Sequence, residues 1–123
     1  MKLENIIKKS LKQLTELSEN EIQNQIIDWS RSNDVLSIVV PNELARNNKS
    51  VKIEKGCSDL IVCLFGVTIY VELKDYRGTQ KPDQIKFQLK VERLGQQYFI
   101  CRSLDQFKTI ILKKKLNNKN INY

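Results

Sequence analysis

The stretch Gly56 to Lys74 reads Gly-Cys-Ser-Asp-Leu-Ile-Val-Cys-Leu-Phe-Gly-Val-Thr-Ile-Tyr-Val-Glu-Leu-Lys. Within it, residues 60–64 and 67–73 are short apolar runs rich in β-branched side chains. Phe65-Gly66, between the two runs, is typical of a tight turn. The pattern predicts a β-hairpin centred on that turn, and the rest of the chain is arranged around it.

This hairpin places two carboxylates opposite each other. In the register that the turn sets, Asp59 lies across from Glu72 on one face, with Cβ atoms roughly 5 Å apart. Lys74 shares that face, because side chains along a strand alternate between its two sides. The sequence therefore predicts two acids and a lysine gathered at one end of the hairpin.

The carboxylate pair has two interpretations. Opposed carboxylates repel and lose hydration on burial, and a divalent cation between them removes both penalties. Oxygen ligands suit Mg²⁺ or Mn²⁺, and Mg²⁺ commonly takes one or two protein carboxylates together with substrate phosphate. The lysine would then orient or deprotonate a water, or balance charge on a phosphate. Alternatively, Asp59 ends a turn, and Glu72 and Lys74 form a solvated strand face.

Composition narrows the class of protein. A chain of 123 residues predicts one domain with a core of modest size. The net charge of +7 and the pI near 9.4 favour a polyanionic partner, most simply nucleic acid. We find no apolar run of membrane-spanning length and no signal peptide, so we expect no membrane partner.

The residue types also limit the chemistry. The sequence contains no histidine, which excludes Ser-His and Cys-His nucleophile pairs and histidine-based metal sites. Cys57, Cys63 and Cys101 lack Cys-x-x-Cys spacing and are odd in number, as expected of reduced thiols in a cytoplasmic protein. Any catalysis must therefore depend on carboxylates, lysine and a metal, with no organic cofactor.

Two helices are predicted before the hairpin. Residues 2–17 have apolar side chains at helical spacing, which indicates a helix that packs on the core or on a second subunit. Ser18 begins the next helix, and Ser18-x-x-Glu21 fits a capping box. Glu21 therefore has two possible roles, closing the capping box or binding a metal, because a side chain that holds a metal cannot also hold the cap.

A strand and a basic loop follow. Leu36 to Val40 is β-branched and ends at Pro41-Asn42. The segment from there to Gly56 is predicted to be a polar loop, with a short extended piece at 51–53. Its cations are either solvated or in contact with phosphate, and the position next to the hairpin favours phosphate contact.

After the hairpin, we predict a helix over residues 82–94, because proline suits the first position of a helix and Gly95 follows the end of this one. Ile85 and Leu89 lie on one side and Phe87 and Val91 nearly opposite, so this helix needs two apolar partners: the sheet, and either the first helix or a second subunit. Gln84 sits at its third position, where a capping role is the simplest explanation.

The C-terminal part of the chain is predicted to hold one more strand and one more helix. Residues 97–102 form the strand, and Ser103-x-x-Gln106 caps a helix that extends to about residue 112. Residues 113–123 are predicted to be a frayed basic tail.

This order of elements, a mixed α/β domain with a small sheet, resembles the PD-(D/E)xK nuclease fold. It is most similar to the VRR-NUC (virus-type replication-repair nuclease) family across residues 18–112, with 1–17 as an N-terminal helical extension. The motifs that carry the resemblance are Glu21-x-x-x-Gln25-x-x-x-Trp29, Pro41-Asn42 with Arg46, Gly56-Cys57-Ser58-Asp59-Leu60, Val71-Glu72-Leu73-Lys74, Gly78-x-x-x-Pro82-x-Gln84, and Gly95 with Tyr98. Two positions depart from the family pattern: Ser58 replaces a proline, and Lys81 stands where a capping serine is common.

The resemblance implies a metal-dependent deoxyribonuclease that acts on branched DNA, such as junctions or flaps, in repair, recombination or replication. It would be a homodimer in the cytoplasm of a bacterium or a phage-infected host cell. Mg²⁺ or Mn²⁺ would be held by Asp59, Glu72, the carbonyl of Leu73 and Glu21. Lys74 would activate water, and Gln84 would orient Lys74 or a metal-bound water. The implied DNA contacts are Arg46, Lys49, Lys52, Arg77, Lys86 and Lys90, with Arg93 beside them.

Three other functions compete with this one. A nucleic-acid-binding module without catalysis would keep the fold, but all the catalytic positions are present. A restriction-type or RNA-directed nuclease would need a sequence-reading element or an aromatic stacking platform, and we find neither. A structural assembly protein would account for the charge and the helices but not for the carboxylate pair.

Overall fold

The computed structural model describes residues 2–8 and 16–119. Its centre is a four-stranded sheet of β1 (Leu36–Val39), β2 (Leu60–Leu64), β3 (Val67–Leu73) and β4 (Gln97–Cys101), in the order β1-β2-β3-β4. The pairs β1–β2 and β2–β3 are antiparallel, and β4 runs parallel to β3. This is the mixed α/β architecture that the sequence predicts.

The hairpin has the predicted register. Leu64 pairs with Val67 and Leu60 with Val71, and Gly66 in the turn has φ of +77°. That left-handed conformation favours glycine, because it has no Cβ to clash with the backbone. Continuing the same register places Asp59 beside Glu72 at the far end of the two strands.

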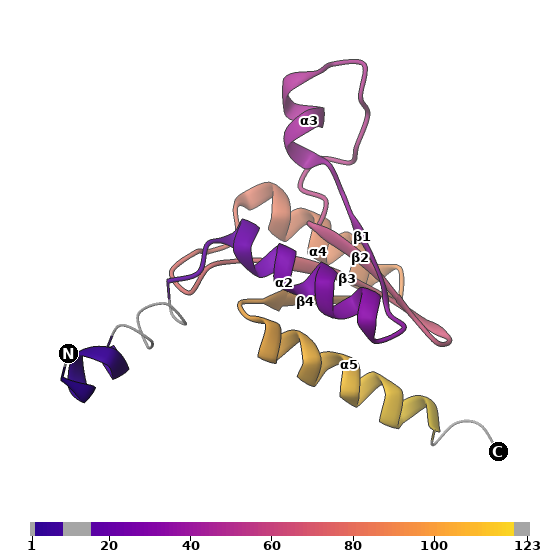
Figure 1. Ribbon diagram of the computed structural model, residues 1–123. Helices are drawn as coiled ribbons and strands as arrows, with labels where there is room; N and C mark the ends of the chain where they lie inside the picture. Colours follow the sequence, from indigo (N-terminus) through magenta and orange to yellow (C-terminus); the bar gives the residue numbers. More distant parts are fainter. Residues whose placement is uncertain (1, 9–15, 120–123) are drawn as a thin grey trace.

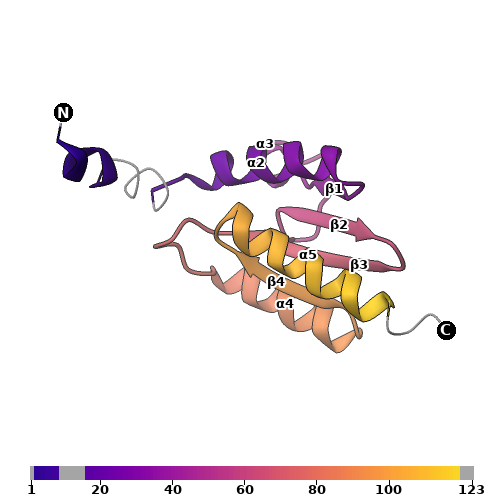
Figure 2. The ribbon, with the colours of Figure 1, turned by 60° about the horizontal axis from the view of Figure 1, so that its bottom comes forward.

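Helices cover both faces of the sheet (Figures 1 and 2). On one face lie α2 (Glu19–Ser32) and α5 (Leu104–Lys119), and their side chains Ile22, Ile26 and Phe107 form the core with the inward residues of β2 and β3. On the other face lies α4 (Pro82–Arg93), where Phe87 makes edge contacts with Tyr70 and tilted contacts with Tyr98. The candidate site forms on this α4 side.

The predicted helix starts have specific partners. Ser18 Oγ accepts from the Glu21 amide at 3.1 Å, and Glu21 Oε1 lies 3.4 Å from the Ser18 amide, so the capping box is complete. At α4, Lys81 has no side-chain acceptor, and only Gln84 Oε1, at 2.8 Å from the Lys81 amide, closes the turn. Ser103 Oγ caps α5 by accepting from the Gln106 amide at 3.1 Å.

Two predictions about loops are wrong. The segment after β1 is not loop throughout, because Asn42–Asn47 forms the short helix α3. The extended piece predicted at 51–53 is not part of the four-stranded sheet. Figure 1 shows α3 and the loop after it standing away from the sheet; we call residues 42–56 the arm. The frayed tail is also wrong for 113–119, since α5 continues to Lys119.

The N-terminal prediction is confirmed only in part. Residues 3–8 are helical, 9–15 lie outside the described residues, and 16–17 are not helical. Leu17 packs against the core ahead of α2. In the part of the chain that the structure describes, we find no helix both long enough and apolar enough to cross a membrane.

Candidate active site

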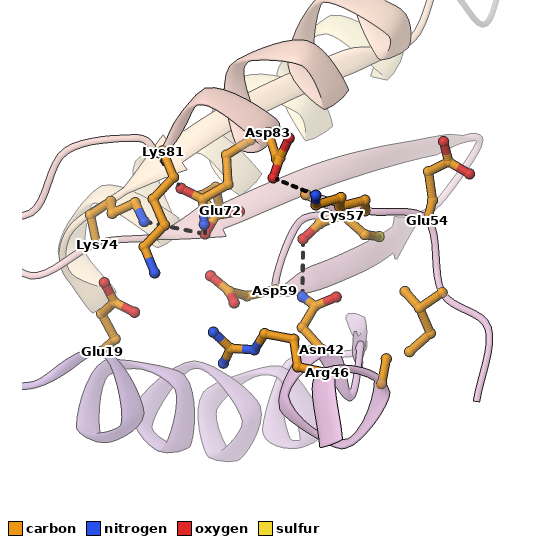
Figure 3. A pocket seen from close by; sticks show the side chains of 15 residues that line it. Glu19, Asn42, Arg46, Glu54, Cys57, Asp59, Glu72, Lys74, Lys81 and Asp83 are labelled. Atoms are coloured by element: carbon orange, nitrogen blue, oxygen red, sulfur yellow. Dashed lines mark hydrogen bonds and ion pairs between the residues drawn. The ribbon is translucent and has the colours of Figure 1, made fainter. Parts of the chain in front are cut away.

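A pocket of about 380 Å³ opens where β2 begins, β3 ends and α4 begins (Figure 3). Asp59, Glu72 and Lys74 all line it, together with Gln84 from the first turn of α4. The arm contributes Asn42 and Arg46 on the opposite side. The pocket therefore gathers residues that are far apart in the sequence around the predicted carboxylate pair.

The two carboxylates differ in their surroundings. Asp59 Oδ2 accepts a hydrogen bond from the Leu73 amide at 2.8 Å, which fixes the aspartate across the end of the hairpin. Glu72 is only 1% exposed, and its Oε1 accepts from Gln84 Nε2 at 3.2 Å. Glu72 Oε2 is buried without a hydrogen-bond partner. A lone pair buried without a partner costs free energy, so this oxygen is a candidate ligand for a cation.

Burial also changes the acidity of the pair. Loss of hydration is the largest cause that raises the pKa of Glu72, to about 9, and the neighbouring Asp59 carboxylate raises it further. Lys74 acts in the opposite direction and lowers it. Without a cation, Glu72 is therefore held in its protonated form at neutral pH.

Lys74 is a buried lysine, 4% exposed. Its Nζ lies 3.7 Å from Glu72 Oε1, and its amide donates to the Cys101 carbonyl at 3.1 Å, which extends the parallel pairing of β3 and β4. A lysine is rarely buried without a paired charge. Its position therefore agrees with a role in the pocket and excludes the solvated strand face.

Backbone contacts hold Asp59 in place. Gly56 has φ of +77°, and a Cβ there would lie 2.1 Å from the Asp83 carbonyl oxygen, so only glycine fits against the start of α4. Asn42 Nδ2 donates to the carbonyls of Cys57 at 3.0 Å and Ser58 at 3.3 Å. Ser58, in the position of the family's proline, is buried and donates to the Leu60 carbonyl at 3.0 Å, which stabilises the turn by a different contact.

The comparisons with known proteins point to one fold. No protein-family model matches the sequence, and no curated protein matches it. A solved structure described as a VRR_NUC domain protein superposes with a TM-score of 0.64 at 21% identity, over 81% of this chain and 89% of that chain. A second, described as a VRR_NUC domain, gives a TM-score of 0.59 at 19% identity, over 77% of this chain and 96% of that chain.

The chain has the VRR-NUC fold. The predicted PD-(D/E)xK-like nuclease architecture is therefore confirmed. At these identities the comparisons establish the fold, and the activity has to be argued from the pocket.

Of the two acids in the first turn of α2, the one that lines the pocket is Glu19 and not the predicted Glu21. The Glu21 carboxylate closes the capping box, with Oε1 3.1 Å from Ser18 Oγ, and Glu21 does not line the pocket. Glu19 lines it instead, and Figure 3 shows its carboxylate directed into the pocket from α2. Burial raises the pKa of Glu19, and Lys74 lowers it.

The sequence does contain a signal that Glu19, and not Glu21, is available to the pocket. The capping box already assigns Glu21 to the helix end, which leaves Glu19 as the free acid in the first turn.

The predicted DNA contacts are spread around the pocket. Arg46 lines it from the arm, and Lys49 and Lys52 are exposed further along the arm. Arg77 stacks on the neighbouring Tyr76 ring, with its guanidinium 5.1 Å from the ring centre. Lys55, another cation of the segment before Gly56, and Lys81 also line the pocket, and of these two only Lys81 was not predicted to contact phosphate.

The α4 lysines differ from each other. Lys86 is exposed, whereas Lys90 pairs with Glu54 of the arm at 3.6 Å. Together with the ion pair between Lys55 and Asp83 at 3.5 Å, this contact ties the base of the arm to α4.

The acids of the pocket do not form a complete protein cage for a metal. Among the described residues, no three His, Cys, Asp or Glu side chains are close enough to hold an ion together. Asp59 and Glu72 form a pair, and Glu19 lies on the far wall of the same pocket. Such a pair is typical of a Mg²⁺ site that takes its other ligands from water, backbone and substrate.

Proposed function

We propose that this domain is a metal-dependent deoxyribonuclease that hydrolyses phosphodiester bonds. One observation carries the proposal: the buried Glu72 shares a pocket with the half-buried Asp59 and the buried Lys74. The nuclease fold supports it. Burial of an acid and a lysine side by side is costly for folding, and a function at that place accounts for it.

The residues present fit a divalent cation. The donors are oxygens, which suit Mg²⁺ or Mn²⁺, and the buried Glu72 Oε2 lacks any other partner. Asp59 and Glu72 would hold the ion with the carbonyl of Leu73, and Glu19 would complete the set directly or through water. When bound, the ion supplies positive charge to the scissile phosphate and a more acidic water.

The chain's own groups do the rest. Lys74, with Nζ beside Glu72, would orient the attacking water and stabilise charge on the phosphate. Gln84 fixes the Glu72 carboxylate through its amide and, by its carbonyl, the start of α4, so one side chain sets the distance between helix and site.

DNA is the proposed substrate because the pocket and the arm are rimmed with cations, which favour a phosphate backbone. The preference for junctions or flaps, and a role in repair, recombination or replication, follow from the resemblance to VRR-NUC nucleases. The proposed homodimer is supported by the outer side of α4, where Leu89 is 62% exposed and Ile85 is exposed beside it.

Cleavage of a labelled panel tests the function. Linear duplex, flap, four-way junction, single-stranded DNA and single-stranded RNA are incubated with Mg²⁺ or Mn²⁺, and Asp59→Asn serves as the matched variant. We expect metal-dependent cutting that Asp59→Asn abolishes, with branched DNA preferred. If the wild type binds DNA but cuts nothing with either metal, the domain is a binding module. If only RNA is cut, the substrate class is wrong.

Metal binding is tested separately by thermal shift. We expect Mg²⁺ or Mn²⁺ to raise the Tm of the wild type but not of Asp59→Asn. The absence of any shift with both metals would favour a structural protein.

A further inference from the structure

The segment directly after Lys74 is a tight turn. Asp75 Oδ1 accepts from the amides of Arg77 at 3.0 Å and Gly78 at 2.6 Å, and the Asp75 carbonyl accepts from the Gly78 amide at 3.2 Å. An aspartate that binds the next amides in this way stabilises a turn locally. We call residues 75–78 the lysine turn, because of what it covers.

The lysine turn packs on the stem of Lys74. A Cβ added to Gly78 would lie 3.2 Å from Lys74 Cδ and 3.1 Å from Asp75 Oδ1, so the glycine backbone lies directly against the lysine methylenes. Lysine has about 2 kcal/mol of rotamer entropy to lose on being fixed. A wall on its stem restricts Nζ to the direction of Glu72.

The lysine turn is held from another strand. Arg102, directly after β4, donates through Nη1 to the carbonyls of Asp75 at 2.6 Å and Gly78 at 2.8 Å, the first and last residues of the turn. The Arg102 amide donates to Gln106 Oε1 at 2.7 Å, which anchors the arginine backbone to the start of α5. A charged donor shared by two carbonyls is among the stronger hydrogen-bonding arrangements.

We propose that Arg102 is a positioning residue that clamps the lysine turn over Lys74 and so keeps the Lys74 ammonium aimed at Glu72. The clamp itself is a structural claim. Its catalytic consequence rests on the function proposed above. Arg102 is not one of the residues that line the pocket, and its side chain contacts the turn, so we infer that it acts on the lysine through the turn.

The clamp is tested by the reactivity of the Lys74 amine. Reductive methylation of the metal-free full chain is followed residue by residue by mass spectrometry, with exposed Lys86 as the internal standard. The variant is Arg102→Met, which keeps length and removes every donor. Arg31→Met, an exposed arginine at the end of α2, is the matched control.

We expect Lys74 to be slow to react in the wild type and in Arg31→Met, and several-fold faster in Arg102→Met. Amide exchange of α2 should be unchanged, because the core does not depend on the clamp. Unchanged Lys74 reactivity would overturn the proposal. Faster exchange throughout α2 along with faster Lys74 modification would also overturn it, since Arg102 would then serve general stability.

Gly78→Ala tests the packing of the lysine turn on the Lys74 side chain if Arg102→Met does not fold. Its Cβ pushes on the Lys74 stem while Arg102 stays in place, so Lys74 reactivity should again rise. No change would contradict the packing argument.

The catalytic consequence is measured separately. If the nuclease assay is positive, Arg102→Met should lower kcat roughly tenfold to hundredfold with an unchanged KM, because geometry and not DNA affinity is altered. Arg102→Lys, which keeps a charged donor, should recover part of the loss. Amine reactivity does not depend on cleavage, so failure of the clamp and failure of the nuclease function give different results.

Discussion

The two faces of β3 are buried in opposite ways. Ile69, Val71 and Leu73 belong to the hydrophobic core beneath α2 and α5. Tyr70 and Glu72 point to the α4 side, and there burial leaves a carboxylate oxygen without a partner. The first face stabilises the fold, while the second is costly and is explained only by what the site does.

The largest expected effect comes from the lysine on the α4 side. Lys74→Met should reduce cleavage by about two to four orders of magnitude, because it removes the group proposed to act on the attacking water. The methionine fills the same buried space, so folding should be kept. Single-turnover cleavage of the preferred substrate measures the loss, and Lys115→Met on the exposed side of α5 is the control. Normal cleavage by Lys74→Met would exclude Lys74 from catalysis.

A substitution on the core face of β3 should lower stability and leave cleavage nearly unchanged. Ile69→Ala, at a position that is 0% exposed, should lower the free energy of unfolding by about 2–5 kcal/mol through lost contacts and a cavity. Cleavage per folded molecule should stay near that of the wild type. Urea denaturation gives the first quantity. Thr68→Ala, the exposed neighbour, should change stability by less than about 0.5 kcal/mol. A similar loss for both substitutions would mean that the two faces do not differ in this way.

Measuring stability over a range of pH tests the buried carboxylate on the α4 side of β3 without any substitution in the core. The raised pKa of Glu72, about 9, means that the folded state keeps a proton that the unfolded state releases at its ordinary acidity. The stability of the metal-free protein should therefore be highest at low pH and fall as pH rises toward about 9. We expect Tm in chelator to drop on the order of 5 °C across that window, and Glu72→Gln to lose most of the drop. A Tm of the wild type that is flat or rises with pH would contradict the burial argument.

Metal should reverse this trend. Protonated Glu72 competes with a cation for the same oxygens, so the Tm increase given by Mg²⁺ should grow with pH. The same titration of Glu72→Gln is the matched control, because its amide does not titrate.

Local signals in the sequence were sufficient for the hairpin and the helix starts. The tight turn at Phe65-Gly66 between two apolar runs was sufficient to predict the register, and a one-residue slip would move Ile69 and Val71 out of the core. Ser18 and Pro82 marked helix starts for reasons that act within one turn of the chain. The carboxylate pair followed directly from the register.

Other features depend on contacts that no local pattern contains. The short helix α3 has no side-chain cap, and its first residue, Asn42, is held by the carbonyls of Cys57 and Ser58 on a distant loop. Which first-helix acid faces the pocket depends on how α2 sits on the sheet, so Glu19 was missed. Arg102 was missed because its partners are backbone carbonyls, which carry no sequence signal.

The prediction of where α5 ends was wrong for a different reason. The basic, asparagine-rich composition of residues 113–123 predicts a frayed tail. Lysine is nevertheless a good helix former, and cations near a helix C-terminus interact favourably with its dipole. The helix therefore continues to Lys119.

The smallest expected effect concerns the arm, which belongs to neither face of β3. Lys49 is exposed there, and among the residues that the structure describes it forms no ion pair, so it is available to a phosphate. Lys49→Ala should weaken DNA binding and make the slope of log affinity against log salt shallower by about 0.9, the value for one lost phosphate contact. Binding is measured by fluorescence anisotropy in the Asp59→Asn background, which removes cleavage from the assay. Lys115→Ala should leave the slope unchanged. An equal change from both lysines would mean that the affinity reflects total charge, and that the arm is no special part of the DNA interface.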